Sequence, residues 1–257
     1  MPYSIALAGK GGTGKTTIAG LLVKYLLQVD KTPVLAVDAD ANSNLNEVLG
    51  LEVSETLGDA REEMKKGVSA GMTKDVFMEM KLEQAVVEAE KFDLIVMGRP
   101  EGPGCYCAAN SLLTQYLERL IGNYSYVVID NEAGMEHISR LTTNNIDVLL
   151  IVSDATKRGI QAASRISELA RELGLNIGRS SFIINQAKDS DADIIGKTLE
   201  SYGLELSGTI PEDEGLRTFD LEGRPLVELS EESPAVSAAF QIFCELLRHR
   251  STERQGD

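Results

Sequence analysis

The chain has 257 residues, of which 43% are hydrophobic and 25% are charged, a composition typical of globular proteins and not of disordered, collagen-like or coiled-coil chains. Its 40 acidic and 25 basic residues give a formal net charge of −15, which argues against nonspecific attraction to nucleic acid or to anionic membranes. No apolar run approaches the ~20 residues that span a bilayer, and we expect no export signal before the first glycine-rich loop. We therefore expect a cytoplasmic protein with a single domain over residues 1–250 and a flexible tail at 251–257.

Short aliphatic runs alternate with longer segments of helical period, which is the pattern of βαβ units. Because runs such as FDLIVM and VLLIV are apolar almost throughout, we expect them to be buried on both faces beneath helices. The order predicts a doubly wound α/β fold with a mostly parallel sheet of about seven strands and helices on both faces. In chain order, the predicted elements are strand 3–8, helix 15–28, strand 33–38, helix 74–90, strand 92–97, helix 108–121, strand 126–130, strand 146–153, helix 159–173, strand 181–185, helix 191–201, strand 206–210 and helix 234–248.

The segment 52–90 has the least sheet-like composition, because it is rich in Glu, Lys and Met. We expect helices there that lie outside the sheet. Their exposed sides could be a solvated amphipathic face or a surface that contacts a partner, and the sequence leaves both open.

A glycine-rich loop follows the first predicted strand directly and precedes the first predicted helix. It matches the phosphate-binding pattern G-x-x-x-x-G-K-[ST] in the strand, loop and helix context that this pattern requires. Glycines let backbone N–H groups approach phosphate oxygens, and the following helix directs its positive end at them. The pattern predicts a phosphate-binding site in which the lysine reaches the β- and γ-phosphates and the first threonine hydroxyl ligates Mg²⁺. The loop consists of Gly9, Lys10, Gly11, Gly12, Thr13, Gly14, the phosphate lysine Lys15, the magnesium ligand Thr16, and Thr17.

A second lysine, Lys10, gives this loop the order K-G-G-x-G-K-T-T. The loop resembles the deviant Walker A loop of the MinD/ParA/nitrogenase-iron-protein class of ATPases. This resemblance implies a P-loop NTPase fold and a nucleotide-dependent homodimer, in which Lys10 of one subunit reaches the ATP of the other.

Acidic residues follow two further predicted strands. The segment V-D-A-D-A-N-S-N, which contains Asp38 and Asp40, resembles switch I of the same class. The resemblance implies that Asp40, or as second choice Asp38, positions the attacking water. Asp130 ends the apolar strand 126–130 as a Walker B carboxylate, and the carboxyl end of a strand beside the P-loop would place it on Mg²⁺-bound water.

Recognition of adenine rests on resemblance. Asn185 closes the strand 181–185, and Pro211, Glu212 and Asp213 follow the strand 206–210. These positions match those where the class contacts the base. Ordinary turn chemistry remains the alternative explanation for both segments.

Two of the three cysteines, Cys105 and Cys107, are separated by one residue and precede a predicted helix. A helix N-terminus lowers the pKa of a thiol and so favours the metal-binding thiolate. Two thiolates fill only half of a tetrahedral site, so a homodimer would supply the four ligands. Thiolates select Zn²⁺, Cu⁺, Ni²⁺ or an iron–sulfur cluster over Mg²⁺. The third cysteine, Cys244, is expected to be a buried small hydrophobe.

The chain as a whole resembles the CooC-type ATPases, which are accessory proteins of carbon monoxide dehydrogenase and acetyl-CoA synthase maturation. Its most specific elements are G-K-G-G-T-G-K-T-T, V-D-A-D, G-R-P-E-G-P-G-C-Y-C and V-I-D-N-E-A-G. The resemblance implies that ATP binding and hydrolysis are coupled to nickel insertion into such an enzyme, and that Cys105 and Cys107 bind Ni²⁺ or Zn²⁺ across the dimer.

Two other functions are compatible with parts of the sequence. An iron–sulfur reductase like the nitrogenase iron protein needs a second cysteine just beyond the Walker B strand, where this chain has Asn131, Glu132 and Ala133. A MinD- or ParA-like positioning ATPase would act on a membrane or on DNA, but we expect neither a nucleic-acid nor a membrane partner. A basic amphipathic membrane helix of the MinD type is not evident near the C-terminus.

Overall fold

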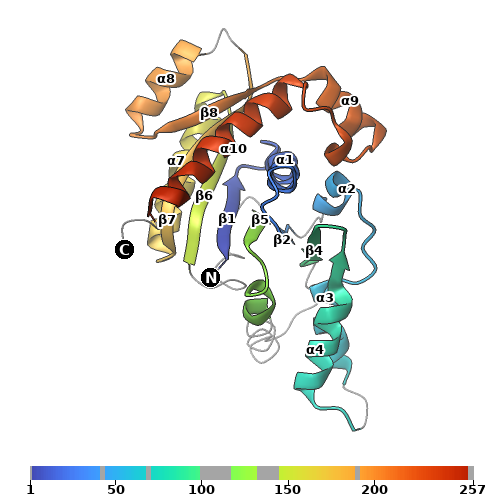
Figure 1. The fold of residues 1–257 in the computed structure, drawn as a ribbon. Coiled ribbons are helices and arrows are strands. Elements are labelled where there is room, and N and C mark those ends of the chain that lie inside the picture. Colours follow the sequence, from blue (N-terminus) through green and yellow to red (C-terminus); the bar gives the residue numbers. More distant parts are fainter. Residues whose placement is uncertain are drawn as a thin grey trace.

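The structure, a computed structural model, describes residues 2–40, 44–67, 71–98, 117–131, 145–188 and 192–253. The described strands form an eight-stranded sheet in the order β3-β4-β2-β5-β1-β6-β7-β8 (Figure 1). Neighbouring strands are parallel except β3, which pairs antiparallel with β4. The doubly wound α/β fold predicted from the sequence is therefore confirmed. The strands are β1 (Tyr3–Gly9), β2 (Val34–Ala39), β3 (Val86–Glu88), β4 (Phe92–Val96), β5 (Tyr126–Asn131), β6 (Asn145–Asp154), β7 (Asn176–Ala187) and β8 (Leu206–Pro211).

Helices cover both faces of this sheet. One face packs against α1, α2 and α10, and the other packs against α3, α4, α7 and the helical residues 117–121. No helix in the described ranges is long and apolar enough to cross a membrane. The helices are α1 (Lys15–Gln28), α2 (Leu45–Leu49), α3 (Leu57–Lys66), α4 (Lys74–Ala85), α7 (Lys157–Glu172), α8 (Ala192–Ser201), α9 (Glu214–Glu222), the short 3₁₀ helix η2 (Leu226–Glu228) and α10 (Pro234–Glu253).

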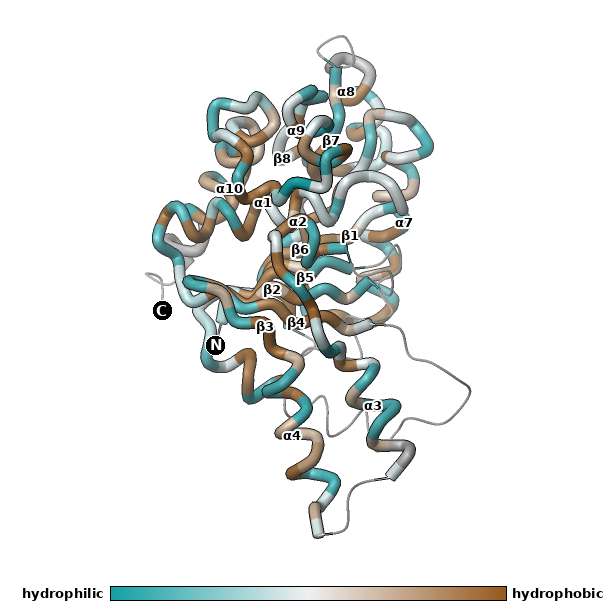
Figure 2. The backbone as a smooth tube through the Cα atoms, turned by 90° about the vertical axis from the view of Figure 1, so that its right-hand side faces the viewer, coloured by the Kyte–Doolittle hydropathy of each residue, from teal (hydrophilic) through white to brown (hydrophobic). Residues whose placement is uncertain are grey.

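The central strands are buried on both faces, as their continuous apolar sequence predicts. In β1, Ile5 and Leu7 face α1 and α10, whereas Ala6 and Ala8 face the opposite helix layer. Figure 2 shows these strands as a largely hydrophobic centre beneath more mixed helices. A parallel sheet covered in this way brings the carboxyl ends of all its parallel strands to one edge, where the loops that follow them meet.

The predicted helix 74–90 is wrong in its last turn. The helix α4 ends at Ala85, and the next three residues form the strand β3, so this part of segment 52–90 lies in the sheet. Val86 and Val87 pair with Ile95 and Leu94 of β4. The β-branched valines favour a strand, and a short hairpin to β4 provides the partner that the local pattern could not reveal.

The helices α3 and α4 form an arm that extends beyond the sheet (Figures 1 and 2). The Lys81 ammonium of α4 holds the arm together, because it pairs with Glu55 at 3.0 Å and with Glu63 of α3 at 2.8 Å. The Thr56 side chain caps α3 in a capping box with Asp59. The prediction of helices outside the sheet is thus correct for 57–66 and 74–85.

Other boundaries differ by a few residues or fall outside the described ranges. Of the predicted helix 108–121, only residues 117–121 are described, and they are helical. The helices α2 and α9 and the 3₁₀ helix η2 were not predicted, because each is too short to show a helical period. At the C-terminus α10 continues to Glu253, five residues past the predicted end at 248, and residues 254–257 are not described.

Candidate nucleotide-binding site

The glycine-rich loop lies between the carboxyl end of β1 and the start of α1. Gly14 stands at the N-cap of α1 with φ +85°, in the left-handed region that favours glycine. A Cβ atom there would lie 2.3 Å from Nδ2 of Asn185. A Cβ atom at Gly11 or Gly12 would meet no atom within 4 Å, so the outer part of the loop faces open space. The loop is therefore tight at its base and open where a phosphate would approach.

Three donors converge on the backbone carbonyl of Lys10. These donors are the Thr13 amide at 3.4 Å, the Thr13 hydroxyl at 2.9 Å and the Lys15 ammonium at 3.4 Å. The Lys15 side chain lies inside the loop and the residue is only 7% exposed, whereas Lys10 is exposed. The two lysines thus have different positions, one inside the phosphate loop and one on the surface of the molecule.

Asp38 and Asp130 lie opposite each other at the carboxyl ends of the neighbouring strands β2 and β5. Both are almost completely buried. The Thr16 hydroxyl of the loop donates a hydrogen bond to Asp130, and Lys15, Asp38 and Asp40 act on Asp130 electrostatically. The structure therefore brings the predicted magnesium ligand and the three predicted carboxylates to one end of the sheet.

Burial perturbs both carboxylates. It raises the pKa of Asp130 to about 7, against the opposing effect of the Thr16 hydrogen bond. It raises the pKa of Asp38 to about 6, against hydrogen bonds from the amides of Leu45 and Asp40. A cation placed between them would favour the ionised forms, because an opposite charge stabilises a carboxylate.

One buried carboxylate oxygen in this cluster lacks a hydrogen-bond partner among the described residues. This oxygen is Oδ1 of Asp130. An unpaired buried carboxylate oxygen is costly. Oxygen ligands are those that Mg²⁺ prefers, and Mg²⁺ keeps several of its waters when bound. The residues present thus fit a magnesium ion held by Thr16, with its waters bonded to Asp130.

The predicted switch I segment, residues 37–44, contains Asp38. One oxygen of its carboxylate accepts a hydrogen bond from the Asp40 amide at 3.1 Å and the other accepts from the Leu45 amide at 2.9 Å. Asp38 therefore contacts Asp40 within the segment and Leu45 just beyond it, and residues 41–43 lie outside the described ranges. Asp40 is partly exposed, as a residue that meets water must be.

A cavity of about 560 Å³ opens beside the start of α1. All four residues predicted to contact the base line it, namely Asn185, Pro211, Glu212 and Asp213, together with Gly14 and Thr17 of the loop. Asn185 is buried, and its Nδ2 donates a hydrogen bond to the Thr13 carbonyl at 2.9 Å. The cavity is large enough for a nucleobase and adjoins the phosphate loop.

Several residues that line this cavity were not predicted from the sequence. Gln186, which has a positive φ of 54°, and residues of α9 also line the cavity, including Arg217 and Asp220. The signals for α9 were present, because Asp213 is a favourable N-cap residue and Gly223 ends the helix in the left-handed conformation. Nine residues of mixed polarity were too few to show a helical period.

The cysteine pair Cys105 and Cys107 falls outside the described residues. Among the described residues, no group of three or more His, Cys, Asp or Glu side chains is arranged to hold a metal ion. Cys244 of α10 is a free thiol that is partly buried against the core, where it hydrogen-bonds with Tyr25. The predicted burial of Cys244 is thus only partial.

Comparisons with known sequences agree on one family of nucleotide-binding proteins. Residues 4–226 match the CbiA family, described as the CobQ/CobB/MinD/ParA nucleotide-binding domain. The chain is 44% identical over 243 residues to an uncharacterized ATP-binding protein of Methanocaldococcus jannaschii, covering 93% of this chain and 96% of that protein. It is 32% identical over 269 residues to the carbon monoxide dehydrogenase accessory protein CooC of Rhodospirillum rubrum, covering 98% of each chain.

The fold is similar to that of a solved nucleotide complex. The septum site-determining protein MinD of Pyrococcus horikoshii, complexed with Mg-ADP, matches with a TM-score of 0.71 and 25% sequence identity, over 96% of each chain. The loop, the carboxylate cluster and the adjoining cavity described above agree with such a ligand. The chain belongs to the CobQ/CobB/MinD/ParA family and is an ATP-binding P-loop ATPase.

Proposed function

We propose that this ATPase couples ATP binding, dimerisation and hydrolysis to the insertion of nickel into carbon monoxide dehydrogenase or acetyl-CoA synthase. The observation that carries the proposal is the 32% identity to a carbon monoxide dehydrogenase accessory protein over 98% of both chains. The Cys105-Tyr106-Cys107 sequence adds a chemical reason, since two thiolates per chain suit a soft or borderline metal ion as cargo.

The positions of the described residues support a separate role for each of them in ATP hydrolysis. Lys15, buried inside the loop, would bind the β- and γ-phosphate oxygens. Thr16 would hold Mg²⁺, with Asp130 and Asp38 bonded to its waters, and the ion would neutralise charge on the phosphates. Asp40, partly exposed beside this cluster, would orient the attacking water. Asn185, Pro211 and Glu212 would contact the base in the adjoining cavity.

Lys10 suggests how hydrolysis is linked to dimerisation. Its side chain is exposed, whereas its carbonyl is held by three donors, so the loop presents the ammonium outward. In a dimer with facing loops, this ammonium would reach the partner's ATP. Such a local charge is needed, because two subunits with a net charge of −15 each repel one another.

Dimer closure would also change the metal site. Each chain supplies two thiolates, which is half of a tetrahedral set, so one ion would be shared by Cys105 and Cys107 of both subunits. Hydrolysis would loosen the interface and thereby lower the affinity for the metal. This would release nickel to the client enzyme at one point of the cycle.

A metal titration tests the proposal. Ni²⁺ and Zn²⁺ are titrated into the wild type and into the double variant Cys105→Ala/Cys107→Ala, with and without nucleotide, while sedimentation reports the oligomeric state. We expect one ion per two chains, an affinity that depends on nucleotide, and loss of the site in the variant. One full-affinity ion per monomer, unaffected by nucleotide, would contradict the proposal.

The similarity to MinD supports a second candidate, a positioning ATPase that acts on a membrane or on DNA. Cosedimentation of the ATP-bound protein with anionic liposomes or with plasmid DNA separates the two functions. Binding to either surface together with an absent metal site would favour the second candidate. A shared metal ion without surface binding would favour nickel insertion.

A further inference from the structure

Asp213 lies where two helices that border the base cavity begin. One oxygen of its carboxylate accepts a hydrogen bond from the Leu216 amide in the first turn of α9, at 3.0 Å. The other accepts from the Ala235 amide in the first turn of α10, at 3.0 Å, and from the Ser233 hydroxyl just before that helix. A single side chain thus satisfies free donors at the N-termini of both helices.

The two helices differ in how much else holds them. The helix α10 packs its buried residues Val236, Ala239 and Phe243 into the core beside α1 and the sheet. The helix α9 has no fully buried residue, and only Leu216 and Phe219 lie partly buried against the core. The position of α9 therefore depends strongly on the contacts made at its two ends.

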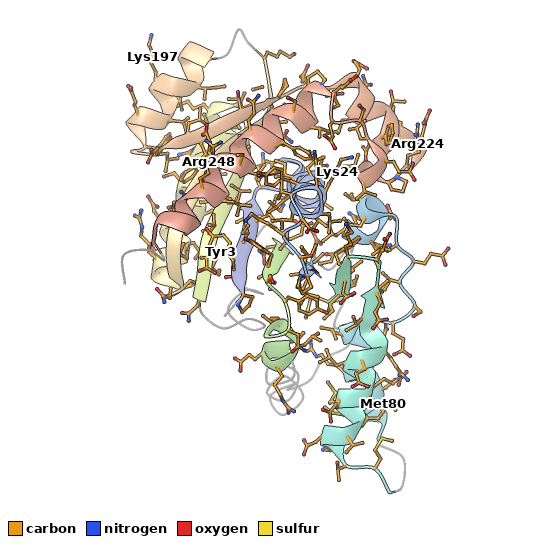
Figure 3. The ribbon with its side chains drawn as sticks, viewed as in Figure 1. Tyr3, Lys24, Met80, Lys197, Arg224 and Arg248 are labelled. Carbon is orange, nitrogen blue, oxygen red and sulfur yellow. The ribbon has the colours of Figure 1, made fainter. Side chains whose placement is uncertain are left out.

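The C-terminal end of α9 is held separately. Arg224, labelled in Figure 3, stacks its guanidinium on the Phe219 ring at 3.8 Å from the centroid, and its amide donates to the Phe219 carbonyl at 2.9 Å. The N-terminal end is attached to α10 through Asp213. Because Leu216, Arg217 and Asp220 of α9 line the cavity, a shift of the N-terminal end would move one wall of it.

We propose that Asp213 is a positioning residue for nucleotide binding, which builds the base cavity by joining α9 to α10 and does not itself read the base. This inference rests on the nucleotide site proposed above. Both carboxylate oxygens are already engaged by the protein, in contrast to Glu212, whose exposed carboxylate pairs with Lys188 at 3.5 Å on the surface. Although burial opposes it, the bonds from Ala235, Ser233 and Leu216 lower the pKa of Asp213, so the carboxylate stays ionised at neutral pH.

The test compares ligands with and without a base. Calorimetry measures the binding of Mg-ADP and of Mg-tripolyphosphate to the wild type and to Asp213→Asn. The asparagine keeps an acceptor for Leu216 but its amide nitrogen cannot accept from Ala235. We expect the Kd of Mg-ADP to rise about tenfold and that of Mg-tripolyphosphate to change less than twofold. In ATP hydrolysis, KM should rise about tenfold with kcat nearly unchanged.

Two further variants separate positioning from direct contact and from general instability. Ser233→Ala removes a donor to Asp213 without altering the cavity lining, and it should weaken Mg-ADP binding about threefold. Its effect should not add to that of Asp213→Asn. Asp59→Asn removes a comparable carboxylate from the capping box of α3, which does not line the cavity, and it should leave both affinities unchanged.

Each alternative outcome overturns the inference. If Asp213 contacts the base directly, Ser233→Ala leaves Mg-ADP binding unchanged, and Asp213→Asn changes the preference for ADP over GDP. If Asp213 only stabilises the fold, tripolyphosphate binding falls as much as ADP binding. Unchanged ADP binding in Asp213→Asn rejects the inference alone, whereas a wild type that binds neither ligand rejects the proposed nucleotide site itself.

Discussion

The amide of Met97 donates a hydrogen bond to the carbonyl of Asp38 at 2.8 Å, where β4 ends beside the carboxylate cluster. The carbonyl of Met97 in turn accepts from the amide of Gly58 in the first turn of α3, at 2.8 Å. The next residue, Gly98, has φ +65°, and a Cβ atom there would lie 2.4 Å from the Thr56 hydroxyl at the N-cap of α3. The base of the α3–α4 arm is thus attached directly to Asp38 of the predicted switch I segment.

Binding of Mg-ATP is expected to slow hydrogen exchange at the base of the arm. The bound ion would hold the Asp38 carboxylate in one position, and the backbone contacts of Met97 would pass this restraint to Gly58. Exchange mass spectrometry of segments that contain Met97 and Gly58, with and without a non-hydrolysable ATP analogue, measures the effect. The start of α4 at Thr73 is the internal control, because no hydrogen bond among the described residues links it to Met97 or Asp38. Equal protection in both states would show that the arm is independent of the nucleotide.

Replacement of Lys15 by methionine should abolish ATP hydrolysis without lowering stability. Among the described residues, the Lys15 ammonium donates a long hydrogen bond of 3.4 Å to the Lys10 carbonyl, so loss of this bond costs little stability. We expect at least a hundredfold lower kcat/KM and a Tm within about 2 °C of the wild type. Both quantities come from a phosphate-release assay and a thermal melt of the same preparation.

Lys24→Met is the matched control for that variant. Lys24, labelled in Figure 3, lies on α1. Its ammonium donates to the carbonyls of Val227 at 2.7 Å and Leu229 at 2.5 Å. Loss of these bonds leaves two carbonyls without a donor, which should cost about 1–3 kcal/mol. The Tm should fall by several degrees, while kcat/KM at 25 °C changes less than threefold. An unchanged Tm would show that water replaces Lys24 without cost.

The protein without magnesium and nucleotide should lose stability as the pH rises from 5 to 8. The pKa of Asp130 is raised from 3.8 to about 7, and that of Asp38 to about 6, so the folded state binds more protons than the unfolded state in this range. Stability then falls with increasing pH, by on the order of 3 kcal/mol for Asp130 at 1.36 kcal/mol per pKa unit.

Denaturation in urea at several pH values with a chelator present measures this slope. Asp130→Asn, which carries no titrating group at that position, should show a clearly weaker pH dependence. Asp93→Asn provides a comparison on β4, since its carboxylate accepts from the Tyr124 hydroxyl away from the cluster. A slope that Asp130→Asn leaves unchanged would assign the pH dependence to other groups.

Lys81→Met should destabilise the arm more than the sheet. The ammonium is 10% exposed and pairs with Glu55 and Glu63, whose side chains are 31% and 46% exposed. Because both glutamates reach solvent, we expect loss of the two ion pairs to lower the free energy of unfolding by about 1–2 kcal/mol, as for half-exposed pairs. Limited proteolysis should cut 57–85 sooner than in the wild type, whereas Glu63→Gln, which keeps one ion pair, should have a smaller effect. Identical digestion patterns would show that apolar packing alone holds the arm.

Much of the fold and of the phosphate site could be predicted from the chain itself, because both depend on local patterns. Continuous aliphatic runs such as 126–130 identify strands that are buried on both faces, and the G-x-x-x-x-G-K-[ST] loop sets its own backbone conformation through its glycines. The carboxylate at the end of a buried strand also follows from position alone. These features are encoded by residues that are neighbours in sequence.

Only the tertiary structure decided the features that join distant segments. The strand β3 exists because Val86 and Val87 meet β4. The helix α9, which lines the cavity beside α1, is attached at its N-terminus to α10 through Asp213. The raised pKa of Asp130 depends on burial beneath the loop beside Asp38. Spacing in the sequence cannot report such contacts, because pairing, burial and charge proximity are set by the folded arrangement and not by local propensity.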